Sequence, residues 1–200
     1  MAGRPREFDR DVALTRAQAL FWERGYEGVS LADLVAATGL ASARLYAAFG
    51  SKEQLFREAV VLYEREEGGF ADRALASEPD VRRALERMFH EAIDVYTRPS
   101  PRGCLVVTAA TNCTEKHHTI QTWLAEHRRS RTESIIGRVG QAVRERQLSA
   151  NTDVEALGQA LSIFLNGLSV QARDGVPPEQ LHASIAVMLS AALTDATPCR

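Results

Sequence analysis

Apolar residues recur every three or four positions along most of the chain, which is the spacing of amphipathic helices. Between Phe8 and Arg24 the apolar positions follow this spacing, and Gly25 ends the pattern. Ser30, followed three residues later by Asp33, is a good start for a further helix. No alternating stretch is long enough for a useful strand, so the pattern predicts an all-α protein with about nine helices.

Two short helices follow one another closely within SLADLVAATGLASARLYAAFGSKEQL, residues 30–55. The first begins at Ser30 and ends at Gly39, which accepts the left-handed geometry found after a helix. The second carries Leu45 and Phe49 on its apolar side. Two short helices joined by a tight turn that contains glycine are typical of a helix-turn-helix, whose second helix enters the major groove of DNA.

The segment FWERGYEGVSLADLVAATGLASARLYAAFGSKEQLF resembles the N-terminal DNA-binding domain of the TetR family of one-component repressors, over about the first sixty residues of the chain. The motif is composite: Phe21, Gly25-Tyr26, Gly39, Leu45-Tyr46, Phe49-Gly50-Ser51-Lys52 and Leu55-Phe56. The resemblance implies a three-helix DNA-binding domain over residues 1–52. A helical domain for ligand binding and dimerisation would then occupy residues 53–200.

The same resemblance implies six DNA contacts within the motif. They are Ser30, Tyr46 and Lys52 on phosphates, and Ser42, Ala43 and Arg44 at base edges. Arg44 is the best base reader, because a guanidinium can bond guanine O6 and N7 together. Ala41, Ala47 and Ala48 stand where polar residues are common in the family, which leaves fewer polar groups for DNA.

The N-terminal tail contains Arg4 and Arg6. Basic arms of this kind can lie in the minor groove, where negative potential is concentrated around an inserted arginine. A solvated tail without a partner is an equally weighted alternative.

The pattern after residue 52 stays helical. The expected helices run from Lys52 to about Ala74, from Ser77 to the Pro-rich break at residues 97–101, over a short buried segment at 103–110, from Glu115 to about Gln147, from Asp153 to Arg173, and from Pro178 onward. The last two are more apolar than one neighbour could cover, which predicts a homodimer through a four-helix bundle. A monomer with both helices in its core is the alternative, and the resemblance to the TetR family favours the dimer. The predicted dimer residues are Leu161, Phe164, Leu168, Ser184, Met188 and Ala191.

A small-molecule pocket is expected between the middle helices, because pockets in helical bundles form there and are mostly apolar. The candidates are Tyr63, Met88, Phe89, Thr108, Trp123, Phe164 and Asn166. Each of these residues, taken singly, is more simply interpreted as part of the core.

Three cysteines are too few, and odd in number, for a disulfide scaffold. Cys104 is a candidate sensor of oxidants or electrophiles, but a small buried hydrophobe is the favoured interpretation, because no Lys or His lies within one helical turn. The histidines at 90, 117, 118 and 127 show no i, i+4 partner that would complete a metal site.

Composition changes this picture little. The net charge is −2, and residues 1–52 hold seven Lys/Arg against six Asp/Glu, so charge alone does not indicate DNA binding. No apolar run of membrane-spanning length and no secretory signal are visible, which favours a cytoplasmic protein. No P-loop, GxGxxG, HExxH or GxSxG motif indicates an enzyme or a cofactor.

The sequence therefore predicts a dimeric transcriptional regulator that binds a near-palindromic double-stranded operator. Repression relieved by a small-molecule effector is the first hypothesis, and the same fold sensing through Cys104 is the second. A helical enzyme without a recognisable motif is the third. An effector would act by biasing the helix after Lys52 and so changing the separation of the two reading heads.

Overall fold

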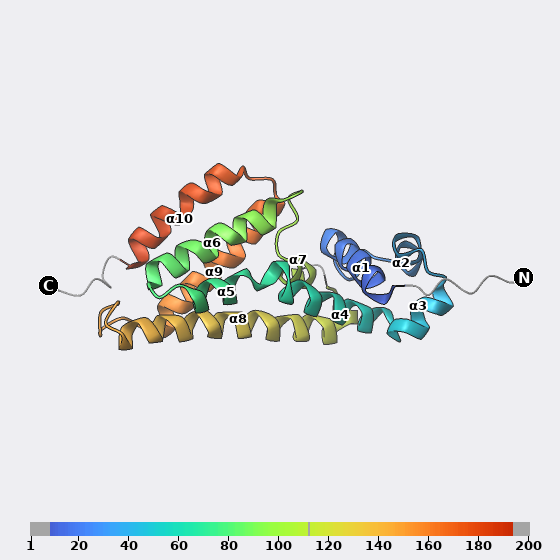
Figure 1. Cartoon of the computed structure of the whole chain (residues 1–200), viewed down its shortest axis with the longest axis horizontal. Coiled ribbons are helices and arrows are strands. Elements are labelled where there is room, and N and C mark those ends of the chain that lie inside the picture. The colour runs from blue at the N-terminus through green and yellow to red at the C-terminus, as the bar shows by residue number, and fades with distance from the viewer. Residues whose placement is uncertain (1–8, 112, 194–200) are drawn as a thin grey trace, which may run out of the picture.

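The computed structural model describes residues 9–111 and 113–193, and all regular structure in these ranges is helical (Figure 1). The prediction of an all-α fold is confirmed. The helices are α1 (Arg10–Arg24), α2 (Leu31–Thr38), α3 (Ser42–Phe49), α4 (Lys52–Arg65), α5 (Phe70–Ser77), α6 (Val81–Thr97), α7 (Leu105–Thr111), α8 (His118–Arg144), α9 (Val154–Arg173) and α10 (Pro178–Leu193). Arg4 and Arg6 lie outside the described residues, so their place in the minor groove stays a prediction.

Local signals explain the helix-turn-helix. Ser30 and Asp33 form a reciprocal capping box at the start of α2. Gly39 ends that helix with φ 72° and ψ 11°, a left-handed conformation that turns the chain into α3 without a steric penalty. Ala41 stands at the N-cap of α3 and provides no side-chain hydrogen bond there.

The three-helix head packs on α4 through aromatic side chains. The Phe21 ring of α1 meets the Phe56 ring of α4 edge-on, with centroids 5.1 Å apart. Tyr26 meets the same Phe56 ring at 5.0 Å. Such pairs each contribute about 0.5–1.5 kcal/mol beyond their burial, so α4 is held firmly against the head.

The helix predicted from Lys52 to about Ala74 is interrupted, contrary to the prediction. After α4 the chain makes a 3₁₀ turn at Glu67–Gly69 and then begins α5. A Cβ atom on Gly68 would lie 2.5 Å from the ring of Tyr63, so only glycine allows that ring to pack against the backbone here. This break gives ten described α-helices rather than about nine.

The body consists of α5 to α10. The long helix α8 runs along its length, with α9, α6 and α10 stacked beside it (Figure 1). The short helix α7 confirms the short buried helix expected after Gly103, and it lies between head and body (Figure 1). No described helix is long and apolar enough to cross a membrane.

The apolar core does not divide at residue 52. One cluster joins the head to α4, α7 and the first turns of α8, and includes Leu105, Ile120 and Leu124. A second cluster fills the space between α5, α6, α9, α10 and the rest of α8. The proposed boundary at residue 52 therefore separates the DNA-reading elements but not two cores.

Candidate DNA-reading surface and effector cavity

The helix α3 exposes the side chains that were predicted to read bases. Ser42, Ala43 and Arg44 are all exposed on its first turn, and Tyr46 is 43% exposed. Leu45 and Phe49 point the opposite way into the head, where they are buried. This division follows the helical period, and it leaves Arg44 free to extend a guanidinium from the surface.

Ser30 is less free to bind phosphate than the sequence indicates. Its backbone N–H donates to Oδ2 of Asp33 over 2.8 Å, and its hydroxyl donates to the same oxygen over 2.5 Å. These hydrogen bonds lower the pKa of Asp33, whose carboxylate is also paired with Arg24 at 3.2 Å. Both donors of Ser30 are thus already used within the capping box.

Lys52 opens α4 immediately after its N-cap, Ser51. Its ammonium lies 4.4 Å from the centre of the Tyr26 ring, a cation–π contact, rather than extending into solvent. Burial lowers the pKa of Lys52 below its ordinary value. If Lys52 contacts a phosphate, its ammonium does so while packed on the ring of Tyr26.

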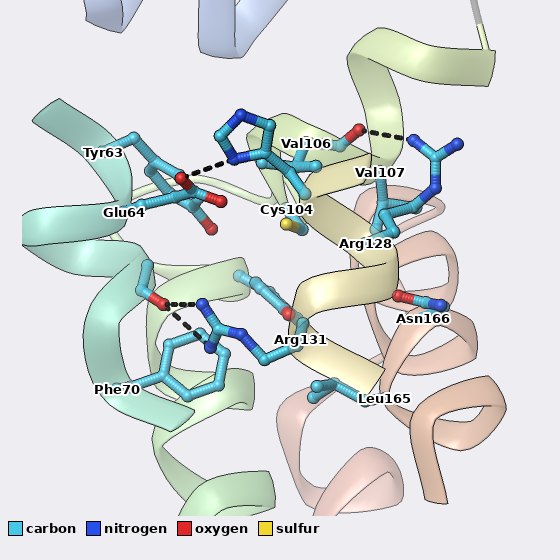
Figure 2. Close-up of a pocket in the computed structure, with 13 residues that line it drawn as sticks. Tyr63, Glu64, Phe70, Cys104, Val106, Val107, Arg128, Arg131, Leu165 and Asn166 are labelled. Atoms are coloured by element: carbon cyan, nitrogen blue, oxygen red, sulfur yellow. Dashed lines mark hydrogen bonds and ion pairs between the residues drawn. The ribbon is translucent and has the colours of Figure 1, made fainter. Parts of the chain in front are cut away.

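A small cavity lies between α4, the start of α5, α6, α7, α8 and α9 (Figure 2). Its volume is about 40 Å³, which accommodates only a few non-hydrogen atoms. The lining residues are Tyr63, Glu64, Gly68, Phe70, Tyr96, Cys104, Val106, Val107, His127, Arg128, Arg131, Leu165 and Asn166. Most of the wall is apolar, with a few polar groups that converge on it.

Of the seven residues predicted for a ligand pocket, Tyr63 and Asn166 line this cavity. The others do not line it. Met88 and Phe89 are fully buried in the core of the body, with Phe164 packed on Phe89 at 5.1 Å. Thr108 is buried in α7, and Trp123 packs against His127 behind the cavity wall at 4.2 Å.

The polar centre of the cavity is formed by Tyr63, Cys104 and Tyr96. The Tyr63 hydroxyl is completely enclosed and has no partner at hydrogen-bond geometry, although the Cys104 thiol lies close enough to interact weakly with it. Burial, more than the thiol, raises the pKa of Tyr63 well above its ordinary value, and burial does the same to the pKa of Tyr96. An enclosed hydroxyl without a partner is costly, about 1–3 kcal/mol, and marks a place where a ligand acceptor would be stabilising.

Two arginines of α8 border the same cavity. Both terminal nitrogens of Arg131 donate to the carbonyl of Gly68 over 3.2 Å, which ties α8 to the turn after α4. Arg128 makes a long 3.4 Å bond to the carbonyl of Val106, and no described carboxylate lies within ion-pair distance of it. Burial lowers the pKa of Arg128, as expected for a partly desolvated cation without a counter-charge.

Sequence reasoning missed most of this cavity. His127, Arg128 and Arg131 lie far from Cys104 along the chain, and only helix packing brings them to one place with Tyr96. The i, i+4 spacing of His127 and Arg131 on α8 was the one signal that these two share a face. His127 instead bonds Glu64 of α4 over 2.8 Å. Within the described residues no cluster of His, Cys, Asp or Glu is suited to a metal.

The residues predicted for a dimer differ in their exposure. Leu161 and Leu168 are buried in the chain's own core, whereas Phe164, Ser184 and Met188 are half-buried and Ala191 is exposed. The large apolar side chains that α9 and α10 expose to solvent are Ile163, Val170 and Val187, at 62%, 42% and 72%.

An exposed recognition helix on a capped three-helix head, joined to a helical body with a small cavity between its helices, defines a helix-turn-helix DNA-binding regulator. Comparison with known proteins agrees. The profile of bacterial regulatory proteins of the tetR family matches residues 13–59, and that of the tetracyclin repressor-like C-terminal domain matches residues 81–188. The chain belongs to the TetR family of transcriptional regulators.

Individual relatives cover nearly the whole chain. The HTH-type transcriptional repressor ComR of Escherichia coli strain K12 is 33% identical over 181 residues, which are 90% of this chain and 86% of ComR. A cysteine-substituted form of the TetR family regulator CifR, complexed with 26-bp double-strand operator DNA, is 41% identical. Its structure superimposes with a TM-score of 0.89 and covers 94% of this chain and 99% of CifR. A TetR regulator from Rhodococcus sp. RHA1 is 33% identical, with a TM-score of 0.63 over 91% of this chain and 98% of its own.

Proposed function

We propose that the protein is a homodimeric repressor that leaves its operator when a small molecule binds in the cavity of each chain. The observation that carries this proposal is the enclosed Tyr63 hydroxyl, which lacks a partner and lies on α4, the helix that follows directly from the recognition helix. A ligand that accepts a hydrogen bond from this hydroxyl contacts α4 directly and can change its position. It would lower operator affinity by the difference between its affinities for the two states.

On DNA, Arg44 reads a base in the major groove, with Ser42 and Ala43 beside it. Tyr46 and Lys52 contact phosphates. Ser30 binds a phosphate only if its N–H or its hydroxyl breaks the hydrogen bond to Asp33. The exposed side chains of α3 and the operator complex of CifR support this arrangement. As a regulator of transcription the protein acts in the cytoplasm and catalyses no reaction of its own.

The homodimer forms through α9 and α10. Ile163, Val170 and Val187 supply the exposed apolar area, and the predicted Phe164, Ser184, Met188 and Ala191 lie on the same two helices. Small alanines and serines on α10 allow close approach of a second copy.

The cavity favours a small ligand with an acceptor oxygen. Tyr63 offers a donor, and Arg128 offers positive charge that no described carboxylate neutralises. The walls made by Phe70, Val106 and Leu165 favour an apolar remainder. Larger ligands require the cavity to widen, since about 40 Å³ accommodates only a few atoms.

A second candidate keeps the same fold but senses electrophiles or oxidants through Cys104. The specific support is that Cys104 lies in the cavity wall near Tyr63 and Arg128, neighbours that the sequence could not reveal.

The test starts with an in vitro selection of duplex DNA bound by the full-length protein. Two half-sites related by a two-fold axis, with centres about 34–36 Å apart or a multiple of one turn, are expected. A library of small oxygen-containing compounds is then screened for operator release by fluorescence anisotropy. Release by reversible compounds that Tyr63→Phe weakens supports ligand sensing. Release only by thiol-reactive compounds, abolished in Cys104→Ser, supports the second candidate, and a single asymmetric half-site contradicts the homodimer.

A further inference from the structure

The last turn of α1, in the head, contacts the chain segment that carries the cavity thiol. The indole Nε1–H of Trp22 donates to the carbonyl of Gly103 over 2.7 Å, and both residues are buried. Gly103 directly precedes Cys104, which lines the cavity. One hydrogen bond thus connects the three-helix head directly to the segment that forms the cavity wall.

Trp22 contacts a second wall of the same cavity. Its ring meets the ring of Tyr63 edge-on, with centroids 4.8 Å apart. The guanidinium of Arg102 covers the indole at 4.0 Å from the ring centre. The side chain of Trp22 is therefore enclosed between α4 and the segment before α7.

The far side of this segment cannot yield. The backbone N–H of Cys104 donates to the hydroxyl of Ser169 in α9 over 2.7 Å. Gly103 lies so close to α9 that a Cβ atom would be 2.5 Å from the carbonyl oxygen of Ser169. Because α9 blocks movement in that direction, an occupant that displaces Cys104 or Tyr63 presses on the indole of Trp22, which bonds Gly103 and packs on Tyr63.

We infer that Trp22 is the positioning residue through which occupancy of the cavity changes the position of α1 and hence of the recognition helix. This route runs through α1 and is separate from the direct effect on α4; it rests on the proposed function of the cavity. Trp22 is adjacent to Phe21, whose ring packs on Phe56, so a shift of the indole moves the aromatic packing of the head. Packed cores transmit such shifts because they rearrange rather than deform.

The test needs no knowledge of the effector, because a larger side chain at position 104 imitates occupancy. Cys104→Met adds two heavy atoms to a cavity of about 40 Å³. Operator affinity is measured by fluorescence anisotropy for the full-length protein, for Cys104→Met, for Trp22→Phe and for the double variant. Trp123→Phe is the matched control. It also removes an indole, but the Trp123 ring packs on His127 and Phe56 rather than on Gly103.

Cys104→Met is expected to weaken operator binding about tenfold, within the roughly 5- to 150-fold range of allosteric couplings. In the Trp22→Phe background the loss should shrink to less than about twofold, while in the Trp123→Phe background it should stay near tenfold. A purely structural role for Trp22 would lower affinity by the same factor with either residue at position 104.

An equal loss in the wild-type and Trp22→Phe backgrounds would overturn this inference and leave the proposed function intact. No loss from Cys104→Met in any background would contradict the cavity's role in regulation as well. Thermal unfolding shows which variants are folded. If Trp22→Phe is not folded, Trp22→Tyr takes its place in the cycle, because it also removes the indole N–H that bonds Gly103, and the same two results decide.

Discussion

Glu27 and Thr114 join the head to the body. One oxygen of the Glu27 carboxylate, in the turn between α1 and α2, accepts the backbone N–H of Thr114 over 2.5 Å and its hydroxyl over 2.9 Å. The same oxygen bonds Nδ1 of His117 over 2.9 Å. The turn that precedes the helix-turn-helix is therefore tied to the residues that begin α8.

These bonds predict a dependence of stability on pH. The backbone bond from Thr114 is the largest cause that lowers the pKa of Glu27 from 4.5 to about 2. Because the folded pKa is the lower one, the unfolded state binds more protons between these values. The stabilisation is complete above pH 4.5 and is lost as the pH falls towards about 2. Urea midpoints of the wild type should therefore fall faster over this range than those of Glu27→Gln, and parallel curves would contradict the assignment.

Tyr63→Phe is expected to stabilise the ligand-free protein. The substitution removes an enclosed hydroxyl that has no partner, and an unsatisfied group of this kind costs about 1–3 kcal/mol. A gain of about 1 kcal/mol would raise Tm by roughly 2–4 °C for a chain of this size. Differential scanning calorimetry measures this change in Tm. Tyr46→Phe, at an exposed tyrosine, is the control and should change stability by less than about 0.5 kcal/mol.

Two glycines should respond to alanine in opposite directions. Gly103 has φ 65° and no space for a Cβ beside Ser169, so Gly103→Ala should destabilise the protein by about 1–3 kcal/mol. Gly137 lies within α8 with nothing within 4 Å of an added Cβ, so Gly137→Ala should stabilise it by about 0.5–1 kcal/mol. Chemical denaturation of the two variants side by side gives the comparison, and a neutral Gly103→Ala would show that the segment can move away from α9.

Val187→Glu is expected to dissociate the proposed homodimer. Val187 is 72% exposed on α10, and a carboxylate there would have to be desolvated between two copies. Light scattering should change from twice the chain mass of 22.0 kDa to that mass, with operator affinity falling in parallel. Val61→Glu, at an exposed valine of α4, is the matched control and should remain dimeric. A dimer that survives Val187→Glu would place the interface elsewhere.

Arg44→Ala should weaken binding to the selected operator by about 1–3 kcal/mol and relax specificity at one base pair of each half-site. Competition with operator variants mutated at single positions locates that pair. Arg98→Ala removes an exposed arginine of the body and should leave operator binding unchanged. Uniform weakening across all operator variants would instead make Arg44 a phosphate contact.

The head could be predicted from the sequence because its determinants are local. The Ser30–Asp33 capping box, Gly39 in the turn and the apolar faces of α2 and α3 each depend on residues within a few positions of one another. The structure forms these features where they were expected. What the sequence did not show is that Asp33 occupies both donors of Ser30 and that the ring of Tyr26 holds the ammonium of Lys52.

The cavity could not be predicted to the same extent. Tyr63 and Asn166 were among the candidates because they are polar or aromatic residues of middle helices. Whether such a residue faces a cavity or the core depends on helix crossing and rotation, which the apolar period does not specify. Cys104 shows the same limit, because a search within one helical turn could not find Arg128, 24 positions away in the chain and beside it in the fold.

The shared apolar cluster of head, α4, α7 and early α8 determines what can be excised from this protein. A fragment ending at residue 52 would lack Phe56 beneath Phe21 and Tyr26, and the Gly103 carbonyl that accepts the indole of Trp22. The DNA-reading helices are thus not an autonomous module that could be transplanted to another protein by cutting at the end of their motif. The position of these helices depends on packing against α4, α7 and α8. A change that loosens this packing therefore also makes the recognition helix less well ordered for binding the operator.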